Sequence, residues 1–249
     1  MVRQPLKSKI ERSWAVPPKD LESTVDFLNW FDKTSSIEDS IQKGQSDWEG
    51  RLTNFSDFKD IDKNTCLEIG FGGGRLLAAA SKYFDSVIGI DIHEAFDKTE
   101  NFLKSQNINN YDLMRRKDIE DIKDKSVDFV YSFIVFQHFD SFEEIDFYLK
   151  QIKRVLAPKG YVHIFWGKLN ATAMLPFSPR LPSSRYFLNP QPAGGRDSTL
   201  FVGSELFCEH LTNLGFTVVE HEDKLPKRIN EALSPTNESS QARALFKIS

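Results

Sequence analysis

The sequence predicts an α/β protein with a mostly parallel sheet. From residue 65 onward, short apolar runs alternate with amphipathic runs, which is the pattern of strands joined by helical crossovers. The first apolar run leads into glycines at positions 70 and 72–74, where a strand would turn into a helix. With 249 residues, 40% of them hydrophobic, the chain can bury one sizeable core.

The expected elements follow from these periodicities in chain order. Two short helices come first, one after Pro17-Pro18 and one after Ser36, where Asp39 stands at a capping position. Strands are then expected within the runs 65–69, 86–91, 111–118, 127–136, 160–167, 216–221 and 242–248. Helices are expected between them at 75–84, at 94–106, after Ser141 with Glu144 in the capping-box position, and from Ser204 as N-cap to Gly215.

Composition narrows the classes of protein and partner. Lys and Arg number 32 against 36 acidic residues, and a net charge of -4 gives no overall attraction to nucleic acid or to anionic lipid. Two cysteines, Cys66 and Cys208, are too few for a disulfide framework and lack metal-site spacing, and no apolar stretch is long enough for a signal or a membrane span. We expect a cytoplasmic protein with no metal site, no nucleic-acid partner and no membrane contact.

The glycine run has the features of a nucleoside site. Gly70, Gly72 and Gly74 let the chain turn sharply and approach a ligand at the positive end of the following helix. Asp91 ends the next predicted strand, 21 residues after Gly70, where a carboxylate can accept hydrogen bonds from both ribose hydroxyls. The glycine run and the carboxylate together predict a nucleoside, whereas the run alone also fits a tight turn with no ligand.

Two residues around the glycines indicate which nucleoside. The third glycine of a dinucleotide fingerprint would fall at position 75, which is Arg75. Glu68, just before the loop, would repel a pyrophosphate but would suit the ammonium group of a methionine moiety.

These residues resemble the class I S-adenosylmethionine-dependent methyltransferases. The first motif of that family, E-x-G-x-G-x-G, is matched in full from Glu68 to Gly74, and the turn L-x-P-x-G is matched at 156–160. The resemblance runs from about residue 65 to residue 167 and returns weakly from residue 204. It implies S-adenosylmethionine as cofactor and a seven-stranded, doubly wound sheet whose last strand is antiparallel. The expected organisation is a helical N-terminal extension over 1–63 and a methyltransferase domain over 64–249, with an irregular substrate-side insertion at 168–202.

The resemblance also implies the cofactor-binding residues. Asp91 would hold the ribose with Ile92 against the adenine, and Asp118 would bind the adenine amino group beside Ile119, unless Asp118 is only a helix cap. Arg75 would reach the methionine carboxylate or pair with Glu68, and Trp48 or Arg51 would line the pocket, unless Trp48 only anchors a helix. The full expected set is Glu68, Gly70, Phe71, Gly72, Gly74, Arg75, Asp91, Ile92, Asp118, Ile119, Ser132, Phe133 and Trp48.

The expected chemistry is methyl transfer to a small polar acceptor, such as a saccharide or another hydroxylated metabolite. His138 follows the fourth predicted strand and is the candidate general base, needed only if the acceptor must lose a proton. The alternative is a histidine that packs against the cofactor or caps the helix after Ser141. A substrate lid is expected from aromatic and basic residues in or beside 168–202, namely Trp166, Phe177, Tyr186, Phe187, Arg180, Arg185 and Arg196. Two alternatives stay open, a nicotinamide-dependent oxidoreductase and a silent binding or scaffold protein of the same fold, and so does the oligomeric state.

Overall fold

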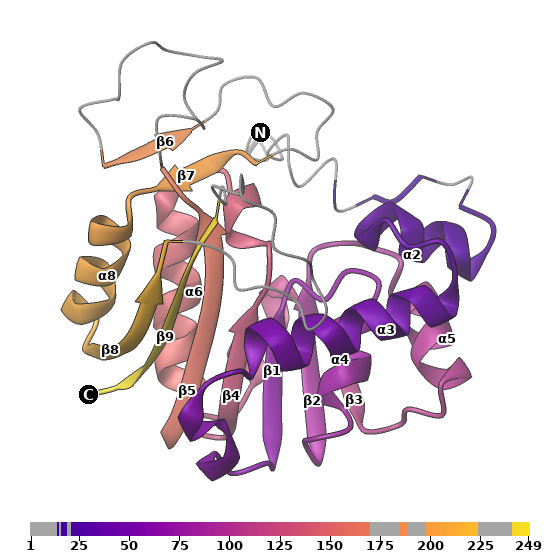
Figure 1. The fold of residues 1–249 in the computed structure, drawn as a ribbon, viewed down its shortest axis with the longest axis horizontal. Coiled ribbons are helices and arrows are strands. Elements are labelled where there is room, and N and C mark those ends of the chain that lie inside the picture. Colours follow the sequence, from indigo (N-terminus) through magenta and orange to yellow (C-terminus); the bar gives the residue numbers. More distant parts are fainter. Residues whose placement is uncertain (1–13, 15, 19–20, 170–184, 189–197, 224–240) are drawn as a thin grey trace, which may run out of the picture.

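A seven-stranded sheet forms the centre of the molecule in the computed structural model, which describes residues 14, 16–18, 21–169, 185–188, 198–223 and 241–249 (Figure 1). The strand order is β3-β2-β1-β4-β5-β9-β8. The strands are β1 (Thr65–Ile69), β2 (Ser86–Asp91), β3 (Tyr111–Arg115), β4 (Val127–Ser132), β5 (Leu156–Gly167), β8 (Phe216–Glu222) and β9 (Gln241–Ile248).

The sheet is parallel except for its last strand. The first five strands are parallel neighbours, and β1 lies between β2 and β4, with Leu67 opposite Ile88 on one side and Val130 on the other. The last strand, β9, runs antiparallel to both β5 and β8. The expected fold class, including the antiparallel last strand, is confirmed.

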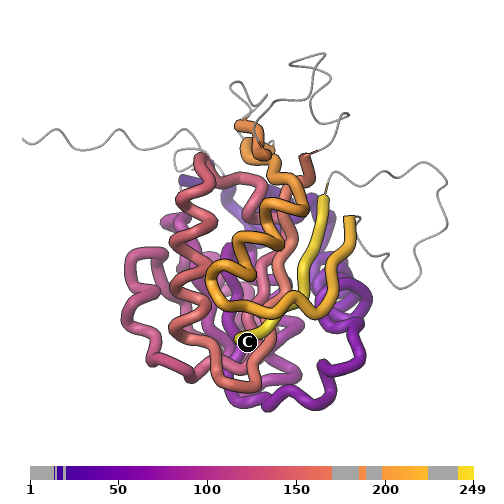
Figure 2. The backbone as a smooth tube through the Cα atoms, turned by 90° about the vertical axis from the view of Figure 1, so that its left-hand side faces the viewer, coloured from indigo at the N-terminus to yellow at the C-terminus, as the bar shows by residue number. Residues whose placement is uncertain are grey.

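The sheet separates two hydrophobic cores, because successive side chains of a strand point to opposite faces. Leu67 and Val130 belong to the core under α6 (Phe142–Val155) and α8 (Ser204–Asn213), whereas their neighbours Cys66 and Phe129 belong to the core under α4 (Arg75–Ala80) and α5 (Phe96–Ser105). Figure 2, turned by 90°, shows α6 and the indigo N-terminal helices on opposite sides of the strands.

The N-terminal helices pack on the α4 side of the sheet (Figure 1). They are α2 (Thr24–Asp32), α3 (Ile37–Asp47) and a π-helical turn, η1 (Trp48–Leu52). Ser23 and Asp26 form a capping box at α2, and the side chain of Ser36 accepts the Asp39 N–H at α3. At the crossing of α3 and α4, a Cβ on Gly44 would overlap the backbone carbonyl of Arg75, so the close approach of the two helices requires glycine there.

Several local expectations were wrong. Gly203, not Ser204, is the N-cap of α8, and Glu144 does not complete a capping box with Ser141 because its carboxylate pairs with Arg116 at 2.6 and 2.7 Å. The segment expected to be irregular contains β6 (Tyr186–Leu188), which pairs antiparallel with β7 (Leu200–Val202). Residues 170–184 and 189–197 of that segment lie outside the described residues, and so do the lid candidates Phe177, Arg180 and Arg196.

No helix in the described part of the chain is both long and apolar enough to cross a bilayer.

Replacing Gly44 with Ala tests the helix crossing. Alanine normally favours a helix over glycine by about 1 kcal/mol. We expect the opposite sign here, a loss of about 1–3 kcal/mol in the free energy of unfolding, because the added methyl group overlaps the Arg75 carbonyl. Urea unfolding measures the change, with Gln42→Ala on the exposed face of α3 as the control, expected within about 0.5 kcal/mol of wild type. A stabilised Gly44→Ala protein would contradict this packing.

Candidate functional site

A cavity of about 680 Å³ opens where β1, β2 and β4 end. Its volume is in the range of small-molecule sites. Nine residues of the expected site line it: Glu68, Gly70, Phe71, Gly72, Arg75, Asp91, Ile92, Phe133 and His138. The parallel pairing of β1 with β2 and β4 is what brings these distant parts of the sequence to one edge of the sheet.

The Asp91 carboxylate fixes the glycine loop from the end of β2. One of its oxygens accepts the Gly72 N–H at 2.8 Å, and the other accepts the N–H groups of Ile92 at 2.6 Å and His93 at 3.2 Å. Each carboxylate oxygen has two lone-pair directions, so the side chain retains capacity for a further donor from the cavity.

The opposite side of the loop is held through the Gly72 carbonyl, which accepts from Thr99 Oγ1 at 3.0 Å and contacts His93 Nε2 at 3.1 Å. His93 Nδ1 accepts the Ala95 N–H, so Nε2 carries the proton of the neutral ring, and burial lowers the pKa of His93. Gly70 has φ 81°, and a Cβ there would overlap the side chain of Val135. The loop is therefore held in one conformation before any ligand arrives.

Glu68 contributes a buried carboxyl group to the wall of the cavity. Its exposed fraction is 2%, and burial raises its pKa to about 8, against the opposing effects of the Tyr131 hydroxyl, which donates to Glu68 at 2.9 Å, and of the Arg75 charge. At neutral pH the group is therefore mostly protonated, and a cation beside it would favour its ionised form.

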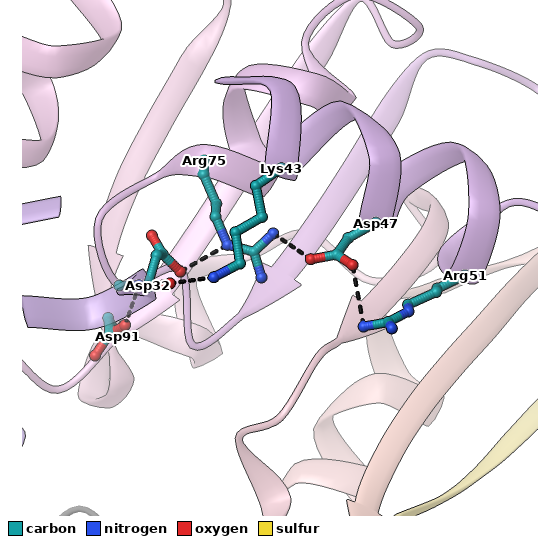
Figure 3. A network of polar contacts seen from close by, with 7 residues as sticks. Asp32, Lys43, Asp47, Arg51, Arg75 and Asp91 are labelled. Carbon is teal, nitrogen blue, oxygen red and sulfur yellow. Dashed lines mark hydrogen bonds and ion pairs between the residues drawn. The ribbon is translucent and has the colours of Figure 1, made fainter. Parts of the chain in front are cut away.

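Arg75 binds the N-terminal extension to the glycine loop (Figure 3). Its guanidinium donates to Asp32 at 2.6 Å and to Asp47 at 2.7 Å, and Asp47 also pairs with Arg51 at 3.1 Å. Arg75 was expected to reach the methionine carboxylate or to pair with Glu68. In the structure its ion pairs are with two carboxylates from α2 and α3. These ion pairs hold α2 and α3, which are distant in sequence, next to the glycine loop.

Asp32 and Lys43 give the extension a direct place in the cavity wall. The Lys43 ammonium donates to the Asp32 carbonyl, and Asp32 Oδ2 lies about 3.4 Å from where a Cβ on Gly73 would be. That oxygen is buried and has no hydrogen-bond partner among the described residues. An unpaired buried carboxylate oxygen is costly, so this position suits a cationic ligand group.

Aromatic rings from the extension form another part of the wall. Trp14, Trp30 and Phe31 line the cavity, and the Trp14 ring lies 5.2 Å from the His138 ring. His138 belongs to a short helical turn, η4 (Phe136–His138), and its Nε2 lies 3.3 Å from the amide nitrogen of Gln137. The expected position of His138 at the carboxyl end of the sheet is the one that the structure has.

Five expected site residues do not line the cavity. Gly74 is the N-cap of α4, Ser132 Oγ donates to the Ile69 carbonyl at 2.9 Å, and Ile119 is fully buried in the core under α6. Asp118 lies on η3 (Arg116–Asp121) with a side chain 35% exposed. Trp48 is fully buried among Phe129, Tyr131 and neighbouring rings.

Four of the lid residues expected in or beside 168–202 can be described, and none of them lines the cavity. Trp166 is buried and stacks on Phe207 with ring centroids 4.0 Å apart, and Arg185 pairs with Glu209 at 2.6 Å. Neither Tyr186 nor Phe187 lines the cavity, which takes Ser198 from that segment among the residues described.

Sequence reasoning missed the residues that the extension supplies, Trp14, Trp30, Phe31, Asp32 and Lys43. The available signal was the run 28–33, in which two large aromatic residues and an acid fall at the end of a nine-residue helix.

Comparisons with known proteins find a family model that matches part of the chain and several similar folds. A family model described as a methyltransferase domain matches residues 67–164, from β1 to β5. The structure is similar to a S-adenosylmethionine-dependent methyltransferase from Clostridium acetobutylicum ATCC 824, with a TM-score of 0.59 and 13% identity over 83% of this chain and 91% of that chain. It is also similar to one from Methanosarcina mazei, with a TM-score of 0.56 and 20% identity over 78% and 98% of the two chains.

A third similar structure contains ligands. It is the 1,6-didemethyltoxoflavin-N1-methyltransferase of Burkholderia thailandensis with bound 1,6-didemethyltoxoflavin and S-adenosylhomocysteine, with a TM-score of 0.58 and 16% identity over 88% of this chain and 81% of that chain. Comparison with curated protein sequences finds no significant match. At identities of 13–20%, the similar structures support the fold alone. The family model supports the methyltransferase motifs within residues 67–164.

Residues 67–164 are similar to a methyltransferase domain, and the fold of the chain is the one that S-adenosylmethionine-dependent methyltransferases have. Within the described residues, no group of three or more His, Cys, Asp or Glu side chains could hold a metal ion.

The raised pKa of Glu68 predicts how stability depends on pH. Between about 4.5 and about 8, the folded protein holds a proton on Glu68 that the unfolded chain has lost, so stability falls as pH rises through this window. Relative to Glu68→Gln, the wild-type free energy of unfolding should fall by up to about 1.4 kcal/mol per pH unit. Urea unfolding from pH 5 to pH 8 measures the difference.

Glu100, a half-exposed surface acid that pairs with Lys104, provides the control, and Glu100→Gln should keep the wild-type difference from Glu68→Gln. A difference between wild type and Glu68→Gln that does not change with pH would mean that Glu68 ionises normally.

Proposed function

We propose that the protein transfers a methyl group from S-adenosylmethionine to a small polar acceptor, a saccharide or another hydroxylated metabolite. The observation that carries this proposal is that Glu68, Asp91 and His138 line one cavity together with the glycine loop. The cavity therefore offers groups that can bind the amino-acid end and the nucleoside end of one cofactor molecule, and a candidate base for the acceptor beside it.

Asp91 is the residue proposed to hold the ribose. Its carboxylate already orients the loop through three N–H groups, and the lone pair left on the oxygen that binds Gly72 can accept one ribose hydroxyl by a charge-assisted bond. The second hydroxyl would replace the longest of the three contacts, the His93 N–H at 3.2 Å. Ile92, next to it in the wall, would pack on the adenine. Asp118 remains a proposed partner of the adenine amino group.

Glu68 and Asp32 are proposed to bind the ammonium group of the methionine moiety. Both carboxyl groups line the cavity, and Asp32 Oδ2 has no partner among the described residues. An ammonium placed between them would lower the pKa of Glu68 and stabilise its ionised form, so binding near neutral pH should release a proton. Lys43, whose ammonium donates to the Asp32 carbonyl, lines the same cavity and is proposed to contact the carboxylate of the same moiety as well.

S-adenosylmethionine supplies a methyl group that the positive sulfonium already activates. The protein's remaining task is to hold the acceptor in line and to exclude water, and such alignment can contribute about 7–11 kcal/mol. His138 would take the proton that a hydroxyl acceptor loses, which requires the neutral imidazole. Its place on η4, at the same wall as Phe133 and Gln137, supports that role.

The alternatives are less compatible with the cavity. A dinucleotide would bring its pyrophosphate to a loop beside Asp32 and Glu68, where the Asp32 carboxylate would oppose it and the protonated Glu68 would supply no positive charge to hold it. A small molecule as acceptor is consistent with the cavity volume of about 680 Å³ and with the similar Burkholderia enzyme, whose structure holds a small molecule.

The roles of the two aspartates can be ranked by calorimetry with S-adenosylmethionine. Asp91→Ala should weaken binding about tenfold or more, because it removes charge-assisted bonds, whereas Asp118→Ala should weaken it less, since its side chain is 35% exposed and does not line the cavity. A nicotinamide dinucleotide should give no heat with the wild type.

A ligand without the ribose 2′-hydroxyl separates binding from loop distortion. Wild type should bind 2′-deoxy-S-adenosylhomocysteine more weakly than the parent compound, and Asp91→Ala should bind the two equally. Equal losses from the two aspartate variants, or an undiminished preference in Asp91→Ala, would contradict the assignment.

His138 can be tested once any acceptor turns over. His138→Ala should lower the turnover number roughly a hundredfold while the affinity for S-adenosylmethionine stays within about threefold of wild type. The pH-rate profile of the wild type should show an acid limb, where the imidazole is protonated, and His138→Gln should lack it. An acid limb that survives in His138→Gln would make His138 a packing residue.

A further inference from the structure

Four rings occupy the wall of the cavity on the side of the N-terminal extension: Trp14, Trp30, Phe31 and His138. We propose that these rings form the acceptor subsite and that the acceptor is a flat aromatic molecule bearing a hydroxyl group. The inference rests on the methyl transfer proposed above and narrows the acceptor within the hydroxylated metabolites.

The rings extend across the cavity as one connected group. Phe31 lies against the glycine loop, with its Cδ1 about 2.9 Å from where a Cβ on Gly72 would be, and its ring is 5.2 Å from that of His93. Trp14 lies 6.0 Å from Phe31 and 5.2 Å from His138, both between ring centroids. The group therefore reaches from the loop after β1 to the turn after β4, where the acceptor must meet the methyl group.

Their mutual geometry suits a further ring. Trp30 meets Phe31 edge to face at 4.5 Å and Trp14 edge to face at 5.2 Å, whereas Trp14 and Phe31 are stacked with an interplanar angle of 20°. Aromatic pairs prefer such stacked and edge-to-face arrangements, and each is worth about a two- to twelvefold gain in affinity beyond the area it buries. A planar acceptor can use both the faces and the edges that these rings present.

The polar groups of this subsite are few. Trp14 Nε1 is a buried donor without a partner among the described residues, so a hydroxyl or carbonyl oxygen of the acceptor would satisfy it. A saccharide carries several hydroxyls, each of which needs a partner when buried. Of the two lysines in the cavity wall, Lys43 donates to the Asp32 carbonyl, and Lys33 is the exposed C-cap of α2, so neither places a cation among the rings.

The hydroxyl oxygen forms the new bond to the methyl carbon as the carbon–sulfur bond breaks and its electron pair passes to sulfur. The hydroxyl proton goes to His138. An aromatic hydroxyl is acidic enough for a histidine to accept its proton as the bond forms, and the ring contact of Trp14 with His138 places that base at the edge of the subsite.

The test uses the full chain saturated with S-adenosylhomocysteine, whose binding is measured first by calorimetry. Absence of that heat would reject the proposed function itself. Saturation-transfer NMR titrations then compare 2-naphthol with methyl α-glucopyranoside. We expect 2-naphthol to bind with a dissociation constant of about 1 mM or below and the glucoside to bind at least about tenfold more weakly.

Two variants locate the probe. Trp30→Ala should weaken 2-naphthol binding about fivefold or more through the lost ring contact, and Trp14→Phe, which keeps a ring but removes the N–H, should weaken it about two- to twelvefold. Tyr83→Ala is the control, because Tyr83 is an exposed aromatic residue that does not line the cavity.

The conservative Trp14→Phe variant keeps the test valid if Trp30→Ala does not fold. A glucoside that binds as tightly as 2-naphthol would overturn the inference, even with S-adenosylhomocysteine bound. So would 2-naphthol binding that neither tryptophan variant changes.

Discussion

The Asp91 carboxylate is the interaction on which the site depends. It accepts N–H groups from the glycine loop and from its own strand end, and it can do so because β1 and β2 are parallel neighbours with Ile69 opposite Ile90. With His93 and Thr99 holding the other side of the loop, three elements fix a backbone that glycine alone would leave mobile. A preorganised loop of this kind loses little conformational freedom when a ligand binds.

The second constraint is charge buried between the extension and the sheet domain. Arg75 is 8% exposed and Asp47 is fully buried, so both charges need partners: Arg75 pairs with Asp47 and Asp32, and Asp47 pairs also with Arg51. Removing one partner of such a pair is costly because the remaining charge stays buried without compensation. The pairs of Arg75 with Asp32 and Asp47 (Figure 3) therefore make α2 and α3 part of the site, and the pair with Asp32 holds the end of α2, where Phe31 lies against the glycine loop.

Much of the sheet and of the loop could be predicted from the sequence, because both depend on local patterns. The run of β1 is buried on both faces of the sheet, as a short apolar run before glycines predicts, and the spacing from Gly70 to Asp91 spans one helix and one strand. The expectations that failed depend on distant partners. The Glu144 carboxylate could have capped the N-terminus of its own helix, but it pairs with Arg116 through two hydrogen bonds instead.

Distant partners also explain what the sequence could not reveal about the cavity wall. Arg75 has acids near it in space that lie 28 and 43 residues away in the chain. Trp14, Trp30 and Phe31 carry no motif, and only the docking of the extension brings them to the loop. Trp48 was expected to line the pocket or to anchor a helix, and its fully buried position among core rings agrees with an anchor.

A crystal structure with S-adenosylhomocysteine would test the central claim most directly, that the cavity at the ends of β1, β2 and β4 is the cofactor site. We expect electron density for one ligand there, with both ribose hydroxyls within about 3 Å of the Asp91 carboxylate oxygens. The amino group should contact Glu68 or Asp32, and the sulfur should face the aromatic rings of the extension. A ligand bound elsewhere on the sheet, or one bound here with its ribose away from Asp91, would contradict the account.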